Sequence, residues 1–90
     1  MGSTPQKPKP TLQDALIELK MNSKRMTRES AKSMKESQNY MKKAKEALKK
    51  NNEDGAKLYL QTAASKRAEA MNVQRMAMKM EFIAGNMKSM

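Results

Sequence analysis

Two long stretches without proline, joined by a short polar break, set the pattern of this chain. Residues 12–50 contain neither proline nor glycine, and small residues recur there every seven positions. A seven-residue repeat is typical of the side of an α-helix that packs against another helix. The pattern therefore predicts a helix over about residues 11–50. Its packing row comprises Ser23, Ser30, Ser37 and Ala44, flanked by a second row through Met26 and Tyr40.

The later stretch has a more regular repeat, with alanine at every seventh position. It predicts a second helix over about residues 56–88, with Glu53 as an earlier possible start and Gly85 and Asn86 as a frayed or bent end. Helices joined by about five residues must lie antiparallel. The sequence thus predicts an all-α fold, a long two-helix hairpin. The contribution of the second helix to the seam consists of Ala56, Tyr59, Ala63, Ala70, Ala77 and Ala84.

Capping signals bound both predicted helices. Thr11 is an N-cap candidate, and Asp14 three residues later completes a pattern that resembles a capping box. The segment KKNNEDG breaks the helical pattern. Asn51 and Asn52 tolerate turn geometry, and Gly55 permits a positive φ. We therefore expect a turn over about residues 51–55.

The composition disfavours a compact globular core. Hydrophobic residues make up 38% of the chain, with one Phe, two Tyr and no Trp. A compact domain of this size usually buries several aromatic rings. All three prolines lie within residues 1–10, which we predict to be a disordered arm rich in Pro and Lys, or in part a cloning remnant.

The segment MNVQRMAMKM, residues 71–80, carries methionines on both flanks of the alanine row. A single partner helix cannot cover both flanks. Either further chain or other copies of the protein would have to pack there, and methionine suits such a site because its side chain adapts to several packings. Simple filling of a flexible core is the alternative. The predicted assembly surface consists of Met71, Met76, Met78, Met80 and Phe82.

The formal net charge is +10, and residues 12–50 carry a net +6 of it. At about 100° per residue, a row of basic side chains falls opposite the seam of the first helix. Such a strip can be a solvated outer face, but its length and its few acidic residues favour binding to an anionic membrane surface. The predicted membrane-binding residues are Lys20, Lys24, Arg28, Lys35, Lys42, Lys45 and Lys49.

Several classes of function find no support in the sequence. There is no His and no Cys, and there is no Gly-rich phosphate loop, so we expect no enzyme activity, no metal site and no cofactor. Two tyrosines do not form the aromatic platform of a nucleic-acid module, so any nucleic-acid binding would be non-specific. No apolar run is long enough to span a membrane.

The stretch NNEDGAKLYLQTAASKRAEAMNVQRMAMKM resembles the first hairpin of the ESCRT-III family, the charged multivesicular body proteins, and is most similar to the type-one branch. The resemblance covers about residues 12–90. Its most specific part runs from residue 56 to 77. The residues that keep the family's order and spacing are Asn51, Ala56, Lys57, Leu58, Tyr59, Ala63, Lys66, Arg67, Glu69, Asn72, Arg75, Met76 and Ala77.

The resemblance implies a cytoplasmic protein that is recruited to endosomal membranes. It would assemble with itself or with other ESCRT-III subunits into filaments for multivesicular body formation and membrane scission. In this family, an AAA ATPase and proteins with MIT domains bind a C-terminal region, which this sequence does not include. We therefore expect the chain to be the N-terminal core of a longer protein.

Two other classes remain open from the residues. The chain could be a helical scaffold, MIT-like or a coiled-coil adaptor, that binds protein without membrane activity. It could also be a basic hairpin that binds nucleic acid through charge alone.

Overall fold

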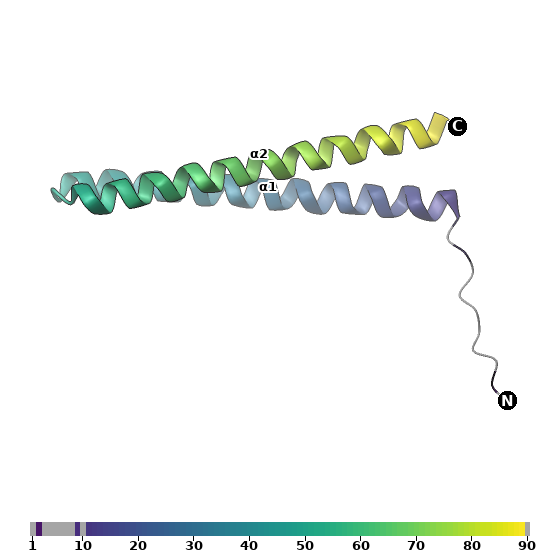
Figure 1. Cartoon of the computed structure of the whole chain (residues 1–90), viewed down its shortest axis with the longest axis horizontal. Helices are drawn as coiled ribbons and strands as arrows, with labels where there is room; N and C mark the ends of the chain where they lie inside the picture. Colours follow the sequence, from purple (N-terminus) through teal and green to yellow (C-terminus); the bar gives the residue numbers. More distant parts are fainter. Residues whose placement is uncertain (1, 3–8, 10, 90) are drawn as a thin grey trace.

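The computed structural model describes residues 2, 9 and 11–89, and residues 11–89 contain two α-helices and one turn. Helix α1 spans Leu12–Lys49 and helix α2 spans Glu53–Ser89. The helices pack antiparallel along their length, with the turn at one end and the start of α1 beside the end of α2 at the other (Figure 1). The predicted all-α hairpin is thereby confirmed. The predicted arm at residues 1–10 falls mostly outside the described residues.

A reciprocal capping box begins α1. The backbone N–H of Asp14 donates to Thr11 Oγ1, and the backbone N–H of Thr11 donates to Asp14 Oδ2, each over 3.1 Å. These bonds satisfy backbone donors that have no partner within the helix. Asp14 also places a negative charge in the first turn, where the helix dipole favours it.

The turn is shorter than predicted, because Asn51 ends α1 and the next residue, Asn52, already caps α2. Asn51 adopts the left-handed conformation with φ of 60°. The backbone N–H of Asn51 donates to the carbonyl oxygen of Leu48, and the backbone N–H of Asn52 donates to the carbonyl oxygen of Ala47. These two bonds form a Schellman motif, which is common at helix C-termini. Only residues 50–52 therefore lie between the helices, and the predicted turn at 51–55 is corrected.

Asn52 ends the turn by capping α2. Its Oδ1 accepts a 2.9 Å hydrogen bond from the backbone N–H of Gly55, so α2 begins at Glu53 and not at residue 56. Gly55 would permit a positive φ, but among the described residues the positive φ is at Asn51. Glycine at position 55 leaves room for the Asn52 side chain, because a Cβ there would collide with it. At the far end, Gly85 and Asn86 were predicted as a frayed or bent end; they lie within α2, which continues to Ser89 without fraying at these residues.

Only small side chains are buried between the two helices. Alanine and serine supply every buried position in the described chain, and no large side chain is fully buried. Small residues at each heptad allow the two backbones to approach closely. The buried positions are Ser23, Ser30, Ser33, Ser37, Ala44 and Ala47 of α1 and Ala56, Ala63, Ala70, Ala77 and Ala84 of α2.

Large apolar residues consequently lie at the edges of the contact or outside it. Leu12, the first apolar residue of α1, is more than half exposed, as are Leu58 and Phe82 of α2. Neither described helix has an apolar stretch of the length needed to cross a bilayer. The hairpin is therefore a narrow structure with two broad open sides.

Candidate functional surfaces

A ladder of serine hydroxyls joins the helices across the seam. Ser30 Oγ donates to the carbonyl oxygen of Ala70 over 2.8 Å, and Ser37 Oγ donates to that of Ala63 over 2.7 Å. Ser23 Oγ contacts the carbonyl of Ala77 and Glu81 Oε1, both at 3.2 Å. Serines seven residues apart on α1 thus bond to alanines seven residues apart on α2, in reverse order along the chain. This pairing defines the antiparallel register.

The larger residues predicted for the seam lie at its margin. Met26, Tyr40 and Tyr59 are half-buried, whereas the serine and alanine rows are buried. The rings of Tyr40 and Tyr59 are 6.1 Å apart between centroids, and the Lys43 ammonium lies 4.9 Å above the Tyr40 ring. This cation–π contact closes one side of the hairpin near the turn.

On that same side, one ion pair links the two helices. Lys66 Nζ lies 3.1 Å from Glu36 Oε2 and 3.7 Å from Glu69 Oε2. The hydrogen bond to Glu36 raises the pKa of Lys66, and the charges of Glu36 and Glu69 act in the same direction. Because the Lys66 and Glu36 side chains are about one-third exposed and that of Glu69 is about half exposed, solvent screens much of this interaction.

The predicted basic strip is exposed throughout, and most of it lies on the side of α1 away from α2. None of these side chains except Lys49 forms an ion pair with an acidic residue of the described chain. Lys49 Nζ lies 3.7 Å from Glu46 Oε1, on the same helix. The strip thus presents a row of unneutralised cations: Lys24, Arg28, Lys35, Lys42 and Lys45.

Lys20 does not belong to this outer row, which corrects the predicted placement opposite the seam. It lies at the side of the contact, next to Lys88 near the end of α2. The pKa of Lys20 is lowered, because its neutral amine can accept a hydrogen bond from the Lys88 ammonium and because the positive charge of Lys88 disfavours a second charge nearby.

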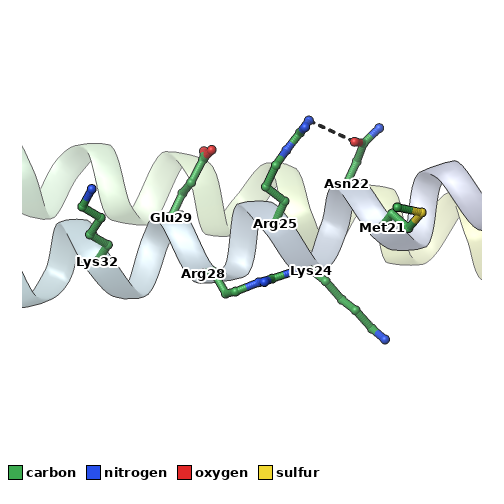
Figure 2. Close-up of a pocket in the computed structure, with 7 residues that line it drawn as sticks. All are labelled: Met21, Asn22, Lys24, Arg25, Arg28, Glu29 and Lys32. Carbon is green, nitrogen blue, oxygen red and sulfur yellow. Dashed lines mark hydrogen bonds between the residues drawn. The ribbon is translucent and has the colours of Figure 1, made fainter.

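Sequence reasoning missed part of the basic cluster near the start of α1. Figure 2 shows Arg25 on one side of the outer surface and Arg28 with Lys24 on the other, with Met21 at the end of the group. These residues, with Lys32, line a shallow depression of about 480 Å³. Arg25 Nη2 donates to Asn22 Oδ1 over 3.0 Å, which orients its guanidinium. The sequence could have indicated this cluster, because Lys24, Arg25 and Lys32 each lie three or four residues from Arg28 and residues at that spacing share a helix face.

The predicted assembly residues divide between the two open sides. Met71, Met76, Met78 and Phe82 are exposed and Met80 is half-buried. Met71 and Met78 follow Ala64 at steps of seven, so they share its side. On the other side, Val73 lines a depression with Glu36 and Lys66, and Met80 follows Val73 by seven.

The side that contains Ala64 also carries an apolar groove between the helices, which we call the Met34–Leu60 groove. Met34 and Met41 of α1 and Leu60 and Ala64 of α2 line it, and its volume is about 470 Å³. Gln38 and Arg67 supply its polar margin. Sequence analysis did not identify this groove, because it requires knowing which residues of the two helices face each other.

No group of three or more metal-ligating carboxylates occurs among the residues that the structure describes. Comparisons with protein-family models, with curated proteins and with solved structures find no match for this chain. Within the described residues, the hairpin has a basic outer face on α1, an apolar groove on one open side, and a mixed polar and apolar surface on the other.

Proposed function

We propose that this chain is the helical core of an ESCRT-III-like protein, which binds anionic membranes and assembles into membrane-remodelling filaments. The proposal rests on the resemblance of residues 12–90 and on one structural observation. That observation is the row of exposed cations from Lys24 to Lys45 on the side of α1 that faces away from α2, which form no ion pair with an acidic residue of the described chain. In this proposal, the protein is cytoplasmic and is recruited peripherally to endosomal membranes for multivesicular body formation.

The helix holds the cations in a fixed line over many turns. From Lys24 to Lys45 the separation is about 30 Å at 1.5 Å per residue. A flat anionic surface can contact all of them together, and each Lys or Arg near such a surface contributes about 1 kcal/mol. Assembly would then multiply these weak contacts through avidity.

The exposed apolar residues on the two open sides provide the surfaces for assembly. Met71 and Met78 lie on the side of the Met34–Leu60 groove, and Met76 and Met80 lie on the other. A helix from a neighbouring subunit could therefore pack on either side, as a growing polymer requires. Methionine accommodates such repeated contacts because its side chain is flexible.

Vesicle flotation tests the membrane contact. The chain should float with vesicles that contain phosphatidylserine, lose binding as salt rises, and not float with neutral vesicles. Lys35→Glu with Lys42→Glu should weaken binding and leave the helix content unchanged. Lys57→Glu with Lys79→Glu is the matched control, since both residues are exposed on α2. Equal binding by the two double variants would remove the basic strip from the proposal.

Filament formation on vesicles tests the apolar surface. Met71→Asp with Met78→Asp should prevent assembly, because it places two charges on one open side. Ser65→Asp with Asn72→Asp is the control, with the same charge change and the same spacing on the exposed back of α2. If electron microscopy shows normal filaments from the methionine variant, Met71 and Met78 do not lie in a contact between subunits.

A helical scaffold without membrane activity is the second candidate, and the Met34–Leu60 groove favours it. Two hairpins joined through this groove would form a four-helix bundle. Sedimentation would then show a dimer in solution, and flotation would fail. RNA that displaces the chain from anionic vesicles at physiological salt would instead support binding to nucleic acid by charge.

A further inference from the structure

Two large apolar side chains lie on the outer surface of α1, where α2 cannot cover them. Ile17 is 52% exposed and Met21 is 65% exposed. Met21 precedes the buried Ser23 by two residues, so it lies roughly 160° around the helix from the seam. Ile17 lies one turn before Met21, and side chains at i and i+4 share a face. The pair therefore forms a small apolar patch that points away from the hairpin.

Cations surround the Met21 end of this patch. Lys24 and Arg25 follow Met21 by three and four residues, and Arg28 follows it by seven, so all three share its face. Figure 2 shows Arg25 to one side of the helix and Arg28 with Lys24 to the other. Glu29 is the one acidic residue that lines this depression, and it forms no ion pair with another described residue.

The combination of exposed apolar groups and cations matches the chemistry of a lipid interface. Phosphates of the head groups would bind Lys24, Arg25 and Arg28, while the acyl boundary would accept Ile17 and Met21. The stems of the basic side chains can lie along the apolar region with their charges at the phosphates. A nucleic-acid backbone would satisfy the cations but would leave the apolar pair in water.

We propose that Ile17 and Met21 insert into the head-group boundary of an anionic bilayer, and that Lys24, Arg25 and Arg28 hold the surrounding lipid phosphates. This inference rests on the proposed membrane binding and goes further, because it assigns the depth and position of the contact. The start of α1 then penetrates the membrane, whereas the later part of the basic strip only lies on it.

Because the chain contains no Trp, a single substitution provides a fluorescent probe of depth. Met21→Trp should show a blue-shifted emission with vesicles of phosphatidylcholine and phosphatidylserine, and brominated acyl chains should quench it. Leu58→Trp is the matched control, because Leu58 is an exposed apolar residue of α2 outside the proposed membrane and assembly surfaces. Its emission should change little when the chain binds.

Affinity provides a second measurement. Ile17→Gln with Met21→Gln should bind these vesicles about ten-fold more weakly than the unsubstituted chain, since burial of both apolar groups is lost. Leu48→Gln with Leu58→Gln also removes two exposed apolar residues, but outside the proposed membrane and assembly surfaces, and should leave binding within about two-fold.

The outcomes separate this inference from the proposed function. Vesicle binding without a blue shift or quenching at Met21→Trp would overturn insertion and leave surface binding in place. Failure of the unsubstituted chain to bind anionic vesicles would overturn both. Insertion is supported by quenching at Met21→Trp and not at Leu58→Trp, together with the selective loss of affinity.

Discussion

The hydroxyl of Ser30 on α1 donates a 2.8 Å hydrogen bond to the carbonyl oxygen of Ala70 on α2, a residue with no exposed surface. This pair stands near the middle of the seam and shows how the hairpin is held. A side chain with one polar atom reaches the opposite backbone directly, because neither residue is large enough to keep the helices apart. The seam therefore combines close backbone approach with hydrogen bonds that span the two helices.

A larger side chain at Ala70 should force the helices apart. We expect Ala70→Leu to lower the free energy of unfolding by about 1–3 kcal/mol, since the added atoms have no space. Ala68→Leu is the control, because Ala68 is exposed on the same helix and leucine is a good helix former. Urea unfolding followed by circular dichroism measures both. Equal stability of the two variants would contradict the tight packing at Ala70.

The serine ladder should contribute beyond packing. Ser37→Ala removes the 2.7 Å bond to Ala63, whereas Ser65→Ala changes an exposed serine that has no side-chain hydrogen bond in the described chain. Both gain the same helix propensity, so their difference isolates the bond. We expect Ser37→Ala to be less stable than Ser65→Ala by about 0.5–1.5 kcal/mol. Matching unfolding curves would assign the ladder no energetic role.

The Lys66–Glu36 pair should give a stabilising contribution that disappears in alkali. The pKa of Lys66 is raised above its ordinary value of 10.5. Its contribution is therefore complete below pH 10.5 and is lost as the pH rises through the higher folded-state value. Lys66→Gln should lower Tm at neutral pH relative to Lys79→Gln, an exposed lysine without an ion pair in the described chain. A Tm difference that persists in strong alkali would contradict this assignment.

The Lys20–Lys88 contact should destabilise the open end of the hairpin. The pKa of Lys20 is lowered, so the repulsion is complete at neutral pH and is relieved as the pH rises towards 10.5. Lys20→Glu should raise Tm at low salt more than Lys35→Glu does, because only the former places a carboxylate beside Lys88. Both variants lower the net charge of the chain equally, so the effect of net charge on Tm cancels when they are compared. Equal Tm values would mean that the two ammonium groups do not interact in solution.

Much of the fold could be predicted because its physical origin is periodic. Alanine at every seventh position from residue 56 to residue 84 defines the packed side of α2 without any reference to α1. The Thr11–Asp14 capping box is equally local, since both partners lie within one turn. Local spacing also predicted the exposed row of cations from Lys24 to Lys45, because each position depends only on its own helix.

The turn was predicted less well because several of its residues are compatible with more than one conformation. Asn51, Asn52 and Gly55 are all common at helix ends, and composition does not assign the left-handed φ to one of them. The structure assigns it to Asn51, which leaves Asn52 to cap α2 and Gly55 to accommodate the Asn52 side chain. This division shortens the turn and starts α2 earlier.

The sequence by itself determined the two helices, the N-cap of α1, the small residues of the seam on each helix and the positive outer face of α1. Only the tertiary structure decided the pairs: Ser30 with Ala70, Lys66 with Glu36, Lys20 with Lys88, and Met34 and Met41 with Leu60. The physical reason is that a heptad pattern gives the angle of each residue around its own axis. Which residues meet across the seam depends on the register, and the three-residue turn with its hydrogen bonds determines that register.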